Sequence, residues 1–226
     1  MKSKQINDIV SFIRKCVLGS GLDNAVIGIS GGIDSAVVAA LAVNALGRYN
    51  VRGILMPYGK QSDIQDSYDV VKKLGITIEE IDITHMVDSF QELENEERIE
   101  IEHIRYGNIK ARVRMICLYD RAKKYNGLVL GTGNKSELLM GYFTLHGDGA
   151  CDLEPIGHLY KTEVFELAKE LKVPKHIIEK APSAGLWDGQ TDEEEMGYTY
   201  KEMDSIFMKA EGMSWKVNLP KMMVKE

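Results

Sequence analysis

The residues most able to do chemistry lie in the segment Gly28–Ser35, which reads Gly-Ile-Ser-Gly-Gly-Ile-Asp-Ser. It follows the apolar, β-prone run Ala25–Ile27 and precedes the helix-forming run Ala36–Ala42, so it predicts a strand, a glycine turn and a helix. Gly31 and Gly32 allow a tight turn and the close approach of an anion. The helix that follows presents unpaired N–H groups and its positive dipole end to that anion. The segment therefore predicts a phosphate-binding corner.

Asp34 is the unexpected member of this corner, because a carboxylate repels phosphate unless a cation lies between them. We therefore expect Mg²⁺, held by Asp34 and phosphate oxygens, while Ser30 and Ser35 add hydroxyl donors. The spacing excludes a Walker A loop, which requires Lys after its last glycine, and the dinucleotide fingerprint Gly-x-Gly-x-x-Gly. An ordinary glycine turn is the alternative interpretation.

The elements that must position this corner alternate between strands and helices. Strand patterns cover Val51–Met56, Ile76–Ile81 and Gly127–Leu130, and helical patterns cover Ile6–Val17, Ser62–Leu74, Met86–Leu93, Gly107–Lys124 and Thr162–Leu171. This order predicts an α/β fold, a Rossmann-like three-layer sandwich with a largely parallel sheet. Ligands of such sheets bind beyond the carboxyl ends of the strands. The loops Gly28–Ser35, Pro57–Gln61 and Gly131–Glu137 are therefore expected to meet at one crevice.

Length and composition favour one domain over residues 1–226, with a mobile loop at about 181–192 and a short irregular C-terminal part at about 205–226. The acidic run Glu193–Glu195 predicts the first turn of a helix with Asp192 as its N-cap. The net charge of −6, with both signs spread along the chain, disfavours a nucleic-acid partner. Three cysteines without close spacing favour a reducing compartment, and we expect no signal peptide, no membrane span and a cytoplasmic location.

Four further residues could act at the crevice. Thr132 and Glu137 follow the last strand, and Glu137 could complete the Mg²⁺ shell or simply cap a helix at the surface. Lys161 could neutralise phosphate charge or be a solvated surface lysine. Asp148, flanked by two glycines, has either a side chain aimed by a permissive backbone or the ordinary role of a turn aspartate.

Several motifs resemble one family. They are Gly107-Asn108-x-Lys110-Ala111-Arg112-x-Arg114-Met115, Gly131–Glu137, Gly141-Tyr142-Phe143-Thr144, Gly147-Asp148-Gly149, Pro155, Leu159-x-Lys161, Pro182-Ser183-Ala184 and Gly189–Glu193. Together with the corner Gly28–Ser35 they are similar to the ammonia-dependent NAD synthetases, members of the N-type ATP pyrophosphatases. The similarity covers most of residues 25–205 and implies a fold of the adenine nucleotide alpha hydrolase type.

The resemblance implies a reaction in two steps. ATP adenylates the nicotinate carboxylate of deamido-NAD and releases pyrophosphate, and ammonia then displaces AMP to give NAD. It also implies a homodimer with dinucleotide sites at the interface. Because 226 residues leave no room for a glutamine amidohydrolase domain, free ammonia is the expected nitrogen donor.

Family roles carry over by matching positions. ATP would contact Gly28, Ile29, Ser30, Gly31, Gly32, Ile33, Asp34, Ser35, Thr132, Lys161 and Ser183, and Mg²⁺ would be held by Asp34 and Glu137. Deamido-NAD would contact Arg112, Leu145, Asp152, Trp215 and Lys216, and Asp148 would take a proton from ammonium. Leu145 departs from the family pattern, because many members carry Lys there.

Two other classes of protein remain as alternatives. Another ATP pyrophosphatase, such as a tRNA thiolase or the synthetase of GMP synthesis, would share the phosphate corner. Thiolases need reactive cysteines and a basic RNA-binding face, which this sequence lacks, and the GMP enzyme lacks the Gly131–Glu137 and Gly141–Gly149 patterns. A non-catalytic nucleotide-binding regulator is disfavoured because Asp34, Glu137 and Asp148 are all retained.

Overall fold

Parallel strands form the centre of the molecule. The computed structural model describes residues 2–60, 64–96, 103–185 and 189–212. Its described part contains one sheet in the order β3-β2-β1-β4. The strands are β1 (Asn24–Gly28), β2 (Val51–Leu55), β3 (Thr77–Glu80) and β4 (Gly127–Val129). Each neighbouring pair is parallel, with Ala25 opposite Val51 on one side and Leu128 on the other. The predicted strands are thus confirmed, within one or two residues at their ends.

Helices connect and cover the strands. The helices before β4 are α1 (Lys2–Gly19), α2 (Ile33–Leu46), α3 (Ile64–Leu74), α4 (Thr84–Glu96) and α5 (His103–Lys124), and α7 (Lys161–Glu170) follows it. Shorter or later helices are α6 (Lys135–Met140), α8 (Lys175–Glu179), α9 (Asp192–Met196) and α10 (Tyr200–Gly212). The helices expected from apolar periodicity are all present, and α2 is apolar on most faces because it is almost wholly buried.

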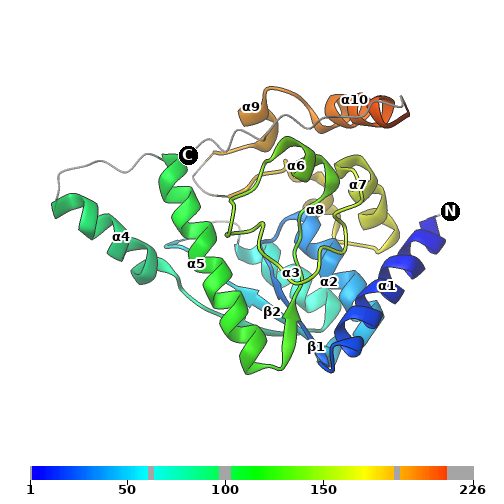
Figure 1. Cartoon of the computed structure of the whole chain (residues 1–226), viewed down its shortest axis with the longest axis horizontal. Helices are drawn as coiled ribbons and strands as arrows, with labels where there is room; N and C mark the ends of the chain where they lie inside the picture. The colour runs from blue at the N-terminus through cyan, green and yellow to red at the C-terminus, as the bar shows by residue number, and fades with distance from the viewer. Residues whose placement is uncertain (1, 61–63, 97–102, 186–188, 213–226) are drawn as a thin grey trace.

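The side chains of β1 alternate between two cores, as the twofold period of a strand requires. Ala25 and Ile27 pack with α1, α2 and α7, whereas Val26 packs on the opposite face, toward α5. Figure 1 shows α1 and α5 on opposite sides of the strands. The three-layer α/β arrangement predicted from the sequence is therefore confirmed.

The C-terminal part of the described chain is more regular than the sequence predicted. Residues 200–212 form the regular helix α10, although the sequence led us to expect an irregular segment from about 205. The helix is stabilised because Tyr200, Met203 and Asp204 are buried against the rest of the molecule, and α10 packs on α6 and α7 (Figure 1). Trp215 and Lys216 lie outside the described residues, as do residues 186–188 of the expected loop at 181–192.

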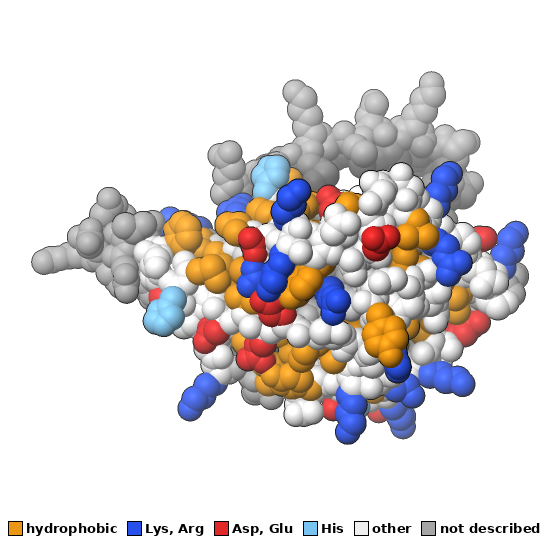
Figure 2. All heavy atoms as spheres, turned by 90° about the horizontal axis from the view of Figure 1, so that it is seen from below, with side chains coloured by type: hydrophobic (Ala, Val, Ile, Leu, Met, Phe, Trp, Pro, Cys, Tyr) orange, Lys and Arg blue, Asp and Glu red, His pale blue; other side chains and the backbone are white. Residues whose placement is uncertain are grey.

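The surface carries charges of both signs. On the face in Figure 2, Lys and Arg side chains are spread among acidic and apolar side chains rather than gathered in one field. No helix in the described ranges combines the length and the apolar character needed to cross a membrane.

The turn after β1 depends on Gly31. Its φ is +76°, and a Cβ placed there would lie 2.8 Å from Asp66 Cβ and 3.1 Å from the backbone nitrogen of Ser67. The start of α3 therefore packs directly on the backbone of the glycine corner. Gly21 has nearly the same φ, +77°, but among the described residues no atom beyond its chain neighbours lies within 4 Å of its Cβ position.

This difference makes Gly21→Ala a matched control for Gly31→Ala. Both variants suffer the left-handed strain of about 1 kcal/mol, but only Gly31→Ala adds steric overlap costing roughly 1–3 kcal/mol more. Urea denaturation followed by circular dichroism measures both free energies of unfolding. Equal destabilisation of the two variants would contradict the packing of α3 on Gly31.

Candidate functional site

Two of the expected loops meet beyond the carboxyl ends of β1 and β4. Asn134 Nδ2 donates a hydrogen bond of 3.1 Å to Asp34 Oδ1, although 100 positions separate the two residues. The contact follows from the parallel pairing of β1 with β4. The described part of the third loop, residues 57–60, hydrogen-bonds instead to Ile83 and Thr84 at the start of α4.

A buried ammonium joins these loops. Lys161 is 2 % exposed, and its Nζ lies 2.6 Å from Asp34 Oδ2 and 3.1 Å from Glu137 Oε1. Burial alone would lower the pKa of Lys161, but the carboxylates of Asp34 and Glu137 more than offset that effect and raise it. Lys161 therefore stays charged at neutral pH. The solvated-surface interpretation is wrong, because the side chain lies inside the molecule.

Glu137 caps a helix, which is one of the two roles that its sequence position left open, but its side chain is largely shielded from solvent. Its Oε2 accepts the N–H of Asn134, and Asn134 Oδ1 accepts the N–H of Glu137, which together form a capping box at the start of α6. Its Oε1 faces Lys161. Burial raises the pKa of Glu137 to about 7, Lys161 opposes the shift, and the like charge of Asp34 adds to it.

The glycine corner is held by its own hydroxyl groups. Ser35 Oγ donates to the carbonyl of Gly32 at 3.0 Å, and Gly32 N–H donates to Ser30 Oγ at 3.3 Å. Gly32 is the N-cap of α2, and no side chain caps the helix there. The first N–H groups of α2 therefore point toward the corner without a side-chain acceptor, which suits an anion. Ile29 and Ile33 are buried beneath the corner.

The segment around α9 and α10 adds residues that sequence reasoning missed. Tyr200 is buried, its hydroxyl donates to Asp192 Oδ2 at 2.9 Å, and Lys161 Nζ lies 4.8 Å from its ring centre. Asp192 is not the expected N-cap, since Thr191 holds that position and Asp192 is buried inside the first turn. Its Oδ1 is buried and has no hydrogen-bond partner among the described residues. The burial of Asp192 was not predicted, because the acidic run after it indicated a helix cap. No pattern in the sequence predicted the burial of Tyr200.

Asp204 ties α10 to the helices that carry the site. Its Oδ1 accepts Ser136 Oγ at 2.5 Å, and its Oδ2 accepts the N–H of Thr162 at 2.9 Å. Ser136 Oγ in turn accepts the N–H of Lys161 at 2.9 Å. This buried chain of hydrogen bonds fixes the starts of α6 and α7 relative to each other.

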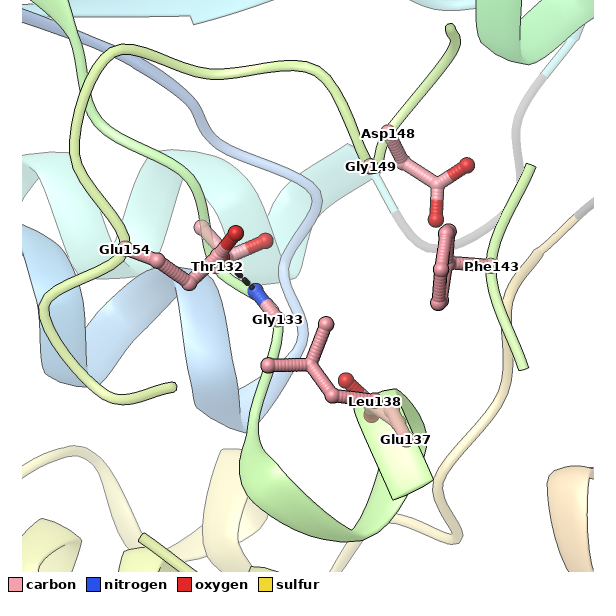
Figure 3. Close-up of a pocket in the computed structure, with 8 residues that line it drawn as sticks. All are labelled: Thr132, Gly133, Glu137, Leu138, Phe143, Asp148, Gly149 and Glu154. Atoms are coloured by element: carbon pink, nitrogen blue, oxygen red, sulfur yellow. Dashed lines mark hydrogen bonds between the residues drawn. The ribbon is translucent and has the colours of Figure 1, made fainter. Parts of the chain in front are cut away.

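A small cavity of about 50 Å³ lies next to this cluster (Figure 3). Its polar walls include Thr132 and the carboxylates of Glu137, Asp148 and Glu154, and its apolar walls include Leu138 and Phe143. In Figure 3, Asp148 and Phe143 lie on one side of the cavity and Glu154 on the other. Thr132, Glu137 and Asp148 were predicted for the crevice, whereas Glu154 was not.

Asp148 has the contacts of a turn aspartate and also a place at the cavity. Its Oδ1 accepts the backbone N–H of Thr144 at 2.9 Å, as a turn aspartate does, while its carboxyl group lines the cavity. Burial raises the pKa of Asp148, whereas the Thr144 hydrogen bonds and the charge of Arg114 oppose the shift. Asp148 is therefore a stronger base than an exposed aspartate.

The residues expected for the dinucleotide come from α5 and from the chain between α6 and α7. Arg112 is exposed on α5, and its Nε donates to the carbonyl of Leu145 at 3.3 Å. Asp152 Oδ2 accepts the N–H of Val129 at 2.8 Å. Ser183, expected near ATP, is exposed, and its hydroxyl accepts the N–H of Gly185.

The parallel sheet, the uncapped glycine corner and the acidic cluster around Lys161 define a nucleotide-binding α/β protein of the adenine nucleotide alpha hydrolase type. The family model described as NAD synthase matches residues 5–225. The chain therefore belongs to the NAD synthase family, and the family resemblance predicted from its motifs is confirmed.

Individual relatives agree with this assignment. The chain is 50 % identical over 200 residues to an NH(3)-dependent NAD(+) synthetase of Methanococcoides burtonii, covering 88 % of this chain and 76 % of that protein. The solved structure of an NMN synthetase from Francisella tularensis superposes with a TM-score of 0.86 at 40 % identity, covering 92 % and 87 % of the two chains. An NH3-dependent NAD synthetase from Campylobacter jejuni, solved with a nitrate ion, gives a TM-score of 0.79 at 34 % identity, covering 94 % and 84 %.

The buried position of Lys161 leads to a prediction about stability. Lys161→Met leaves Asp34 and Glu137 facing each other without a cation, so it should lower the free energy of unfolding by about 3 kcal/mol in metal-free buffer near neutral pH. Lys169, exposed and paired with Glu166 at 2.7 Å, provides the control, since Lys169→Met should change stability little. Urea denaturation compares the two variants, and similar effects would argue against a buried, charged Lys161.

The raised pKa of Glu137 predicts how stability depends on pH. Between its ordinary value of 4.5 and about 7, the folded metal-free protein binds more protons at this group than the unfolded chain. The contribution of Glu137 to stability is therefore present below about pH 4.5 and lost as the pH rises through about 7, on the order of 3 kcal/mol. Glu137→Gln should remove that decline, whereas Glu166→Gln on the surface should keep it. Melting temperatures measured with a chelator test this, and parallel curves for all three proteins would refute it.

Proposed function

We propose that this chain makes NAD from deamido-NAD, ATP and ammonia. The observation that carries the proposal is the placement of Asp34, Glu137 and Lys161 beside the glycine corner in a member of the NAD synthase family. A free carboxylate resists attack by ammonia, because its leaving group would be oxide. Adenylation exchanges that leaving group for AMP.

In the first step an oxygen of the nicotinate carboxylate attacks the α-phosphorus of ATP. The bond to the β-phosphate breaks, and pyrophosphate leaves with the bonding electrons. The corner Gly28–Ser35, with Thr132, Lys161 and Ser183, would contact ATP. The N–H groups at the start of α2 support this role for the corner, because no side chain caps them and they can donate hydrogen bonds to an anion.

The donor set fits Mg²⁺ held by Asp34 and Glu137. Asp34, Glu137 and Asp192 are three carboxyl groups around a single ammonium, so one divalent cation can compensate the negative charge that Lys161 leaves unbalanced. The buried Oδ1 of Asp192, without a partner among the described residues, supports the same conclusion, since it can accept a water from the shell of such an ion. When bound, Mg²⁺ would neutralise charge on the phosphates. Lys161 is then free to turn toward a phosphate oxygen.

Deamido-NAD would bind Arg112, Leu145 and Asp152, together with Trp215 and Lys216. The chain would act as a homodimer with the dinucleotide at the interface, and α5 would contribute to that interface. The exposed side chains of Ile104 and Ile116 on α5 support this placement.

In the second step Asp148 would take a proton from ammonium, because ammonium has no lone pair with which to attack. Ammonia then adds to the acyl carbon, the C–O bond to AMP breaks, and the amide of NAD remains. The elevated pKa of Asp148 and its position at the cavity support this role.

A second candidate reaction is the amidation of nicotinate mononucleotide, because the Francisella tularensis structure is described as an NMN synthetase. The half-exposed, uncharged Leu145 favours it, since many family members would place a lysine there against a dinucleotide. The chemistry of both steps is the same for either substrate.

The purified protein with ATP and Mg²⁺ distinguishes these reactions when pyrophosphate and the amide product are measured with each nicotinate substrate. We expect pyrophosphate release to require deamido-NAD, NAD to form with ammonium, and glutamine to be inactive as a donor. Higher kcat/KM with the mononucleotide would favour the second candidate. Pyrophosphate release with neither substrate would refute both.

A further inference from the structure

Three carboxyl groups line the cavity beside α6, and the proposed steps use only those of Glu137 and Asp148. Glu154 enters from the side opposite Asp148, and the ring of Phe143 and the side chain of Leu138 complete the wall (Figure 3). A volume of about 50 Å³ admits one or a few molecules the size of water or ammonium. Carboxylates and an aromatic face are groups that bind a small cation.

Glu154 is held firmly in this position. Its Oε1 accepts the N–H of Gly133 at 2.6 Å, and its Oε2 accepts the thiol of Cys151 at 3.1 Å. A Cβ on Gly131 or Gly133 would lie 2.6 or 2.9 Å from Oε1. The two glycines of this loop therefore leave room for the carboxylate, which still has free lone pairs.

The second proposed step releases two protons, which one base cannot accept. Ammonium must lose one proton before it can attack the acyl carbon. After ammonia has added, the new nitrogen is positively charged and must lose another proton to become an amide. The acyl adenylate and ammonium thus give the amide, AMP and two protons, whereas Asp148 can take only one of them.

Resting on the proposed function, we infer that Glu154 is the second proton acceptor of the amide-forming step. Ammonium binds between Asp148 and Glu154 and gives one proton to Asp148. The lone pair so released attacks the acyl carbon, the C–O bond to AMP breaks with its electrons on AMP, and the second proton passes from nitrogen to Glu154. Both carboxylic acids then return their protons to water when the product leaves.

The surroundings of Glu154 suit a base. Burial raises its pKa, the hydrogen bonds from Cys151 and Gly133 oppose the shift, and the negative charge of Asp148 adds to it. The positive charge of Arg114 acts on Asp148, so the two bases are in different environments. Two carboxylates facing one small cavity would favour ammonium over water, because ammonium carries a positive charge.

Glu154→Gln tests the inference, because the glutamine Oε1 can still accept the N–H of Gly133. We expect the single-turnover burst of pyrophosphate with deamido-NAD to stay within about twofold of the parent. NAD formation with ammonium should fall on the order of 10²-fold. Hydroxylamine, which is neutral near pH 8 and has only one proton to lose, should restore hydroxamate formation to within about threefold of the parent.

Glu166→Gln is the matched control, because it makes the same exchange at an exposed glutamate outside the site, and its NAD formation should stay near that of the parent. If Glu154→Gln does not fold, Glu154→Asp withdraws the carboxylate by one methylene and should slow the ammonium step alone. Equal losses with ammonium and hydroxylamine, or a lost pyrophosphate burst, would show that Glu154 only supports the loop and would overturn the inference. A parent protein without any pyrophosphate burst would instead refute the proposed function.

Discussion

The site depends on one buried ammonium held between two carboxylates from distant parts of the chain. Asp34 lies in the first turn of α2, Glu137 in the first turn of α6, and Lys161 begins α7. Each of these charges would be costly to bury alone, but together they compensate one another. The positive ends of α2 and α6 also stabilise the two carboxylates. The starts of three helices therefore converge, and the ammonium of Lys161 offsets the repulsion between the two carboxylates.

The last described helix supports this arrangement from outside the sheet. Tyr200 packs its ring on the Lys161 ammonium, and Asp204 accepts hydrogen bonds from Ser136 and Thr162. Residues beyond position 190 thus determine how residues near 34, 137 and 161 face each other. The α9–α10 segment therefore helps to position the residues of the site.

The sequence allowed the fold and the meeting of the loops that carry Asp34 and Glu137 to be predicted, because both depend on local patterns. Alternating strands and helices indicated a parallel sheet, and a parallel sheet fixes which loops meet. The burial of Lys161 could not be predicted, since it follows from the packing of α7 and α10 around it. Asp192 was interpreted as a cap because acidic residues favour helix starts, yet its neighbour Thr191 occupies that position. The position of Glu154 in the cavity could not be predicted, because it depends on the packing of Gly131 and Gly133 against its carboxylate.

The capping box of α6 has a further consequence. The single amide of Asn134 begins the helix with its oxygen and holds Asp34 with its nitrogen. Aspartate would keep the acceptor but lose the donor, serine would be too short to span both partners, and glutamine would displace both ends by a methylene. A substitution of Asn134 therefore affects helix initiation and the alignment of the acidic cluster at the same time. Local folding and ligand geometry depend on the same side chain, and evolution can change one only together with the other.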